Sequence, residues 1–389
     1  MTHFSERTNW PSHLNPLSEK LAQLKREGAG FMDLTESNPT RCGFSFLEAP
    51  LLSALTAPQS LRYEPDPRGL LRAREAVCGY YERKGIRLNP EQIFLTSSTS
   101  EAYHYVFRLL AGPGDAVLAP KPSYPLFEYL AGLSDVVLKT YALSAARDWR
   151  TDSACLEAAC PEPARAVILV HPNNPTGHFV TAGERKELDL FCRRRSAALI
   201  CDEVFLDYAL HGGEVQSFAD NQETLTFTLS GISKILGLPQ MKLSWIVVNG
   251  PEAEREEALR RLEIIADAYL SVNAPVQNAL SRWFELQPRI TEEIRLRLSD
   301  NLETLQEAAG NQLQRVCLPQ GGWYAALRLP ASREDEAWAM EFLEQDGVLI
   351  HPGYLFDFEE PAPFGVISLL PEPEKFKAGV KKIFERMNA

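Results

Sequence analysis

The feature that most constrains the fold is a regular alternation of apolar runs and helical segments between residues 46 and 275. The apolar runs are rich in Val, Ile, Leu and Phe without polar alternation, as expected for strands covered by helices on both faces. This pattern predicts an α/β fold with a mainly parallel, doubly wound sheet flanked by helices. The predicted strands are 92–96, 115–120, 165–172, 196–203, 225–230 and 243–250, and two predicted helices between them span 101–112 and 183–195.

The rest of the chain has a different pattern. Residues 251–310 are highly charged and have helical periodicity. Two short strands and a final helix follow, at 322–329, 348–353 and 372–387. Because 389 residues exceed what one hydrophobic core usually supports, two domains are expected. We predict a large domain of residues 46–275 and a smaller α/β domain formed by residues 1–45 and 276–389.

The composition limits the partners and the compartment. The net charge of −12 argues against nucleic acid or an anionic membrane as a partner, since either calls for a basic face. The seven cysteines include no Cys-x-x-Cys pair and no metal-like Cys/His cluster, which favours reduced thiols in a cytoplasmic protein and no metal site. The first sixteen residues contain no apolar stretch, and the longest apolar runs are too short to span a bilayer. We therefore expect neither a signal peptide nor a membrane segment.

Three short segments carry most of the chemical information. They offer an amide at Asn174, a carboxylate at Asp202 and an amine at Lys234, each at the end of a predicted strand. An aldehyde cofactor on a pyridine ring needs such a set: a lysine for the Schiff base, an anion for the ring nitrogen and a polar group for the ring hydroxyl. The segments are HPNNPTG (171–177), CDEVF (201–205) and SGISKILGLPQMK (230–242).

These segments resemble the fold-type I, pyridoxal-phosphate-dependent aminotransferases of class I/II. The order of the three residues, the step of 28 residues from Asn174 to Asp202 and the step of 32 to Lys234 suit that family. The resemblance implies that Lys234 forms the Schiff base with pyridoxal 5′-phosphate and that Asp202 keeps the ring nitrogen protonated. It also implies that Asn174 hydrogen-bonds the ring hydroxyl and a substrate carboxylate.

Each of these assignments has a plainer alternative. Lys234 taken alone is a surface lysine after a strand, and Asn174 is part of an ordinary turn. Asp202 could cap the next helix, with Glu203 as the functional acid.

The phosphate of the cofactor has a candidate site in TSSTSEAY (96–103), which joins a strand to a helix. Ser98, Thr99 and Ser100 can place hydroxyls and backbone N–H groups at the helix N-terminus, where the dipole favours an anion. A plain Ser/Thr N-cap is the alternative. Ser230, beside the lysine segment, is a further candidate for cofactor binding.

Two tyrosines also match family positions. Tyr124, in KPSYPLF, resembles the aromatic residue that stacks on the cofactor ring, although a tyrosine of the core would look the same. Tyr63 matches a position that crosses the subunit interface to reach the partner's phosphate. The resemblance therefore implies a homodimer with shared active sites.

Several positions depart from the family pattern. Phe205 stands where the family usually has a tyrosine that donates to the ring oxygen, so that donor is absent. Lys242 stands where an arginine usually forks onto the phosphate; lysine keeps the charge but loses the bidentate geometry. Gly231 stands where a hydroxyl is common.

The most consequential departure concerns the substrate. Val366 aligns with the arginine that anchors the substrate α-carboxylate, and residues 351–374 contain no arginine or lysine. Arg41 is our substitute candidate, with Ser37 in the same segment, because that segment of the family lines the substrate pocket; an exposed loop charge is the alternative. Trp323 and Tyr324 either line the pocket or form part of a core strand.

The sequence thus predicts an aminotransferase of amino acid metabolism that transfers an amino group between an amino acid and a 2-oxo acid. A lyase or other carbanion reaction on an amino acid is the alternative, because the same cofactor supports it. A non-catalytic, cofactor-sensing protein is a third hypothesis, which the net charge of −12 and the absence of a basic helix-turn-helix segment disfavour.

Overall fold

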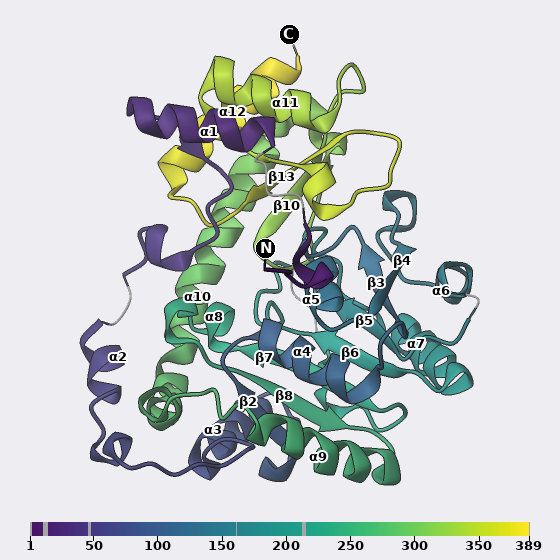
Figure 1. Ribbon diagram of the computed structural model, residues 1–389. Coiled ribbons are helices and arrows are strands. Elements are labelled where there is room, and N and C mark those ends of the chain that lie inside the picture. Colours follow the sequence, from purple (N-terminus) through teal and green to yellow (C-terminus); the bar gives the residue numbers. More distant parts are fainter. Residues whose placement is uncertain (1, 11–14, 46–47, 161, 212–214, 389) are drawn as a thin grey trace.

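The centre of the molecule is a seven-stranded sheet in the order β2-β8-β7-β6-β5-β3-β4 (Figure 1). The computed structural model describes residues 2–10, 15–45, 48–160, 162–211 and 215–388. The strands are β2 (Ile93–Thr96), β3 (Ala116–Lys121), β4 (Val137–Ala142), β5 (Ala166–Val170), β6 (Ala198–Asp202), β7 (Thr226–Gly231) and β8 (Ser244–Asn249). From β4 to β7 all neighbours are parallel, whereas β8 is antiparallel to both β7 and β2. The predicted fold class, mainly parallel with helices on both faces, is confirmed.

Both faces of the sheet are buried, which explains why its strands lack polar alternation. Ile168 and Ile200 pack in one core with residues of the helices α4 (Thr99–Leu110) and α9 (Glu252–Asp267). Their neighbours Val167 and Leu199 point to the opposite face and pack against residues of α7 (Ala182–Arg195) and α6 (Ser153–Ala159). The sheet is therefore a buried layer between two layers of helices.

The strand β4 was not predicted from the sequence. It lies at the edge of the sheet and pairs only with β3, and its residues are alternately exposed and partly buried up to Tyr141. Half of its residues face solvent, so the run VLKTYA is interrupted by polar side chains. A search for continuous apolar runs therefore passes over it.

The remaining strands form two smaller sheets. One has the order β12-β13-β10-β9, and the other pairs β1 (Met32–Asp33) with β11 (Val348–Leu349). The predicted strand 348–353 is divided between the two sheets at Ile350. The other strands of the larger of these sheets are β9 (Val316–Cys317), β10 (Tyr324–Arg328), β12 (His351–Pro352) and β13 (Phe364–Ser368).

A 36-residue helix, α10 (Ala274–Ala309), connects the large sheet to the rest of the chain. Figure 1 shows it running from beside α3 to the helices α1 and α12, and it contacts α3 and α12. The helices not yet given bounds are α1 (Pro16–Glu27), α2 (Glu48–Ala54), α3 (Leu71–Glu82), α5 (Phe127–Leu133), α8 (Ile232–Ile235), α11 (Asp335–Glu341) and α12 (Pro373–Met387).

The largest hydrophobic cluster includes residues from both predicted domains. Val77 and Trp245 from the part before 275 share it with Leu280 of α10 and Phe376 of α12. The division into residues 46–275 and the remainder stays a prediction, and its boundary at residue 46 lies outside the described residues. Within the described part of the chain, no helix is long and apolar enough to cross a membrane.

Candidate active site

The carboxyl ends of β5, β6 and β7 meet at one edge of the sheet, where open α/β sheets bind ligands. A cavity of about 110 Å³ lies there. Asn174, Asp202 and Lys234, 28 and 32 residues apart in the sequence, all line it. The described residues that line it are Thr99, Tyr124, Val170, Asn174, Asp202, Val204, Phe205, Gly231, Ser233, Lys234, Ser244 and Tyr324.

Asp202 is the last residue of β6, and its side chain is almost completely buried. Its carboxylate accepts hydrogen bonds from the hydroxyl of Tyr103 (3.1 Å) and from the backbone N–H of Val204 (3.2 Å). Burial raises the pKa of Asp202 to about 6, against the opposing effects of these two donors and of the Lys234 charge. The carboxylate is therefore mostly ionised at neutral pH.

Lys234 lies in the four-residue helix α8, directly after β7. Burial lowers the pKa of its amine to about 8, and the negative charge of Asp202 opposes that shift. Its Nζ lies 4.8 Å from the ring centroid of Trp323 and 5.5 Å from that of Phe205. A substantial fraction of this amine is neutral, and hence nucleophilic, near physiological pH.

Asn174 is held in a loop with little freedom. Its Oδ1 is buried and has no hydrogen-bond partner within the described part of the molecule. Gly177, three residues further on, has a φ of +74°, and a Cβ there would lie 2.4 Å from Cβ of Pro319. The loop is therefore packed tightly against the segment 319–321. The buried amide oxygen of Asn174 is left free to accept a hydrogen bond.

Steric crowding explains why position 231 is a glycine. Gly231 pairs with Ser244 across β7 and β8, and a Cβ at 231 would lie only 2.3 Å from Ser244 Oγ. The hydroxyl of Ser244 thus occupies the space that a side chain at 231 would take. The cavity has a hydroxyl near this point, but β8 supplies it.

The residues predicted to hold the phosphate differ in their positions. Thr99 lines the cavity as the first residue of α4, while Ser98 is the N-cap and accepts from the backbone N–H of Glu101 (3.2 Å). Ser100 is half-buried in the same turn. Ser98 is therefore an N-cap, and the phosphate-binding role of this segment stays a prediction.

Ser230 and Lys242 do not line the cavity. The hydroxyl of Ser230 is buried and points to the carbonyl of Glu203 (3.4 Å). Lys242 is exposed and has a φ of +52°. Their predicted contacts with the cofactor stay predictions.

Aromatic side chains form much of the cavity wall. Tyr124 and Tyr324 line it, and burial raises the pKa of Tyr124 to about 12, so its hydroxyl stays protonated. Phe205 also lines it and packs edge-on against Trp323, with ring centroids 5.4 Å apart. Trp323 itself is completely buried behind this wall.

The predicted substrate-binding residues lie outside this lining. Val366 is completely buried in β13, opposite Ala326 in the register with β10. The Arg41 side chain is 74% exposed, and its nearest carboxylate, that of Glu36, is 4.0 Å away. Among the described residues that line the cavity, Lys234 is the only cationic side chain.

Ser37 connects this segment to the cavity. Its side chain lies near the hydroxyl of Tyr324, a wall residue. The segment that carries Arg41 therefore lies next to the cavity, although the guanidinium points to solvent.

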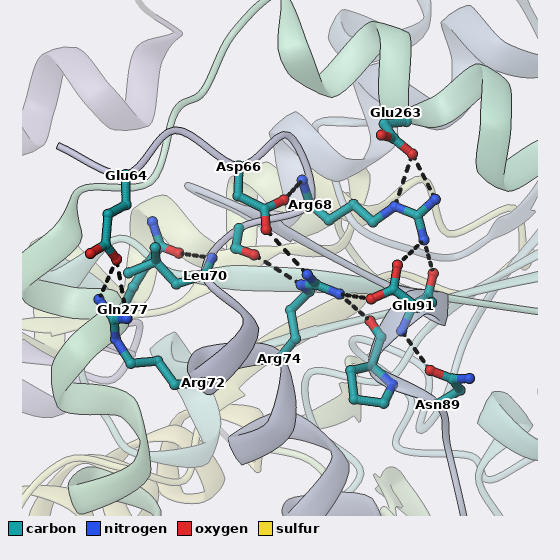
Figure 2. A network of polar contacts seen from close by, with 12 residues as sticks. Glu64, Asp66, Arg68, Leu70, Arg72, Arg74, Asn89, Glu91, Glu263 and Gln277 are labelled. Atoms are coloured by element: carbon teal, nitrogen blue, oxygen red, sulfur yellow. Dashed lines mark hydrogen bonds and ion pairs between the residues drawn. The ribbon is translucent and has the colours of Figure 1, made fainter.

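The side chain of Tyr63 is 85% exposed, so most of its surface makes no contact within one chain. The loop that follows it is fixed by an ion-pair network, which Figure 2 shows. Buried Arg74 contacts Asp66 (3.2 Å) and Glu91 (2.8 Å), and Arg68 links Glu91 to Glu263 (2.6 Å). An exposed tyrosine thus stands on a rigid support.

Sequence reasoning missed three contributors: Tyr103, Val204 and Ser244. Tyr103 lies in the segment 96–103, about one turn into α4. A tyrosine at that place in the segment is the only sequence signal for its role. The contact of Ser244 with Gly231 depends on strand register, for which the sequence has no signal.

This set of groups fits pyridoxal phosphate. A nucleophilic amine, a buried carboxylate and an unpartnered amide oxygen face one cavity, and the N-terminus of α4 lies at the same cavity with hydroxyls beside it. Fold and site together define a fold-type I, pyridoxal-phosphate-dependent enzyme.

Comparisons with known proteins agree. A family model described as aminotransferase class I and II matches residues 34–383. The glutamate-pyruvate aminotransferase AlaA of Escherichia coli is 26% identical over 363 residues, 91% of this chain and 90% of that protein. The alanine aminotransferase of Mycobacterium tuberculosis is 27% identical over 372 residues, 91% of this chain and 85% of that protein.

The solved structure of an alanine aminotransferase from Pyrococcus furiosus has the same fold. It matches with a TM-score of 0.88 at 22% identity, over 99% of this chain and 100% of that chain. The protein belongs to the class I and II aminotransferases, enzymes that use pyridoxal phosphate to transfer amino groups.

The charge of Asp202 supports the protonated form of Lys234, and this coupling can be measured. Asp202→Asn removes the attraction and leaves the burial, so we expect the pKa of Lys234 to fall below about 8. The neutral fraction at pH 7 then rises, and the rate of reductive methylation of Lys234 in the apoprotein rises with it. Mass spectrometry of the modified lysine between pH 6 and 10 measures the midpoint.

Asp207→Asn is the matched control, because Asp207 pairs with Lys84 and Tyr80 instead. An unchanged midpoint in Asp202→Asn, or an equal shift in both variants, contradicts the coupling.

Proposed function

We propose that Lys234 is the lysine that binds the cofactor and moves the proton in an amino-group transfer between an amino acid and a 2-oxo acid. The observation that carries this proposal is that Lys234 lines one cavity with Asp202 and Asn174, and burial lowers the pKa of its amine to about 8. When bound, pyridoxal phosphate supplies electron withdrawal that stabilises negative charge at the substrate Cα.

Several residues in or beside the cavity wall have a proposed part in holding the cofactor. Asp202 would pair with the ring nitrogen and Asn174 with the ring hydroxyl, and Tyr124 would stack on the ring. Thr99, with Ser98 and Ser100, would hold the phosphate at the N-terminus of α4. Ser244 joins this set, because its hydroxyl fills the space at Gly231.

The amine of Lys234 then acts as base and acid. As a neutral amine its Nζ would take the proton from the substrate Cα, and as an ammonium it would give that proton to the cofactor carbon that keeps the transferred nitrogen. A pKa near 8 suits both tasks at neutral pH.

The substrates are proposed more coarsely. The relatives named glutamate-pyruvate and alanine aminotransferase support small amino acids and their 2-oxo acids. Arg41 is our proposed carboxylate anchor: its guanidinium is only loosely paired, and Ser37 of the same segment lies near Tyr324 of the cavity wall.

We also propose a cytoplasmic homodimer. The seven cysteines are free thiols in the structure, which supports a reducing compartment. Tyr63 and Leu270 line a second cavity of about 220 Å³, and Leu61 beside Tyr63 is 93% exposed. Exposed apolar side chains on a loop held rigid by ion pairs suit a second copy of this chain.

The covalent role of Lys234 predicts a simple spectroscopic result. The wild-type protein with pyridoxal phosphate should show the absorbance of a lysine-bound cofactor, and Lys234→Ala should lose it. Lys121→Ala is the control, because Lys121 ends the neighbouring strand β3 outside the cavity lining.

Adding an amino donor then distinguishes the chemistry. An aminotransferase converts the cofactor to its pyridoxamine form, whereas a lyase returns it unchanged. A wild-type protein without the absorbance band of the bound cofactor refutes the proposal. If no amino donor removes that band, amino-group transfer is refuted.

The role of Arg41 predicts a change in substrate affinity. Arg41→Ala should raise KM for the amino donor about 10-fold or more and leave kcat nearly unchanged. The variant loses a charge-assisted bond to the substrate carboxylate, but the groups at the reacting atoms stay the same. Steady-state kinetics measures this. Arg87→Ala is the control, because Arg87 is an exposed arginine before β2, at the edge of the sheet opposite the cavity. Equal KM values in both variants exclude Arg41.

The dimer predicts a measurable change of mass in solution. Sedimentation of the wild-type protein should give a dimer, and Leu61→Asp should weaken it, since a charge would be buried in the interface. Leu190→Asp, which alters a 42% exposed leucine on α7, should leave the dimer intact. A monomeric wild-type protein contradicts the proposal.

A further inference from the structure

The helix that carries Lys234 is too short to hold itself in place. α8 has four residues, so most of its carbonyl groups lie beyond the reach of its own N–H groups. The carbonyl of Lys234 accepts from the backbone N–H of Gly237 at 3.1 Å. A single turn with so few internal bonds depends on partners from elsewhere in the fold.

Two buried side chains supply such partners. The hydroxyl of Tyr208 donates to the carbonyl oxygen of Lys234 at 2.6 Å. The hydroxyl of Thr291 donates to the carbonyl of the next residue, Ile235, at 3.0 Å. The carbonyls of the reactive residue and of the residue after it are thus held by side chains from distant parts of the sequence.

Tyr208 is itself firmly held. It is completely buried, and its backbone N–H donates to the carbonyl of Phe205 at 3.0 Å. Its carbonyl accepts from Gly322, and its ring packs edge-on against Trp323 at 5.3 Å. The same Trp323 ring lies 4.8 Å from Nζ of Lys234. Tyr208 therefore joins the backbone of the lysine to the wall against which its amine lies.

Thr291 belongs to α10 and is oriented by its own helix. Gln287, one turn earlier, donates from Nε2 to Thr291 Oγ1 at 3.1 Å. The hydroxyl accepts this bond on one lone pair and donates its single proton to the carbonyl of Ile235. The long helix thus contacts the lysine turn through a directed hydrogen bond.

We propose that Tyr208 is a positioning residue for the reaction: its hydroxyl fixes the backbone of Lys234, and Thr291 supports it from α10. This rests on the proposed role of Lys234. The lysine side chain has four rotatable bonds to its amine, so the place of its Cα sets the volume in which Nζ moves. Misplacing a reacting group by about 1 Å costs as much as 10²-fold in rate.

The test compares Tyr208→Phe with Tyr141→Phe. Both tyrosines are completely buried, and both donate to a backbone carbonyl, Tyr141 to that of Ile168 at 2.8 Å. Each variant loses one buried hydrogen bond of the same kind, so their thermal stabilities should fall alike. Tyr141 lies on the edge strand β4 and does not line the cavity.

Only Tyr208→Phe should change the chemistry of Lys234. We expect kcat for amino transfer to fall about 10-fold with KM nearly unchanged. In the apoprotein, the rate at which Lys234 captures added pyridoxal phosphate, measured by borohydride reduction and mass spectrometry, should fall as well. Thr291→Val, which keeps the side-chain shape, should change both rates in the same direction by a smaller factor.

Equal effects of Tyr208→Phe and Tyr141→Phe on both rates overturn the proposal. If Tyr208→Phe does not fold, Thr291→Val decides alone, and unchanged rates in it count against the proposal. A wild-type protein that shows no amino transfer refutes the proposed function instead. The capture rate in the apoprotein still tests Tyr208 in that case, so the two failures are distinguishable.

Discussion

The site depends on one costly arrangement, a carboxylate buried at the end of a central strand. Asp202 is ionised although only 7% of its surface is exposed, and an unpaired charge in such a place costs about 3–5 kcal/mol. The hydroxyl of Tyr103, the N–H of Val204 and the charge of Lys234 offset that cost. The helix α4, the loop after β6 and the lysine turn after β7 therefore meet at the same point.

The sequence predicted those parts of the fold in which the residues stay apolar over a whole strand. Central strands such as β5 are buried on both faces, so their residues are apolar throughout. The edge strand β4 and the two-residue strands β1 and β9 lack such runs, because half of β4 faces solvent and the other two are too short to show a pattern. Their existence depends on tertiary partners that a local pattern does not contain.

The candidate site was predictable to the same extent. Asn174, Asp202 and Lys234 stand in short motifs at fixed spacing, and they do meet in one cavity. Tyr208 and Thr291 contact the lysine turn only through the folded chain, and no spacing in the sequence indicates them. Position 231 shows the same limit: the sequence shows a hydroxyl missing, while the structure shows Ser244 filling its space.

The packing of Gly177 has a consequence for how such an enzyme can diverge. Any side chain there would collide with Pro319 and with the carbonyl of Gly321, so the loop that presents Asn174 has almost no room for substitution or insertion. The Arg41 side chain is 74% exposed, so a substitution there meets no such collision. Under the proposed roles, differences in substrate preference are therefore expected to arise in the N-terminal segment rather than in the loop of Asn174.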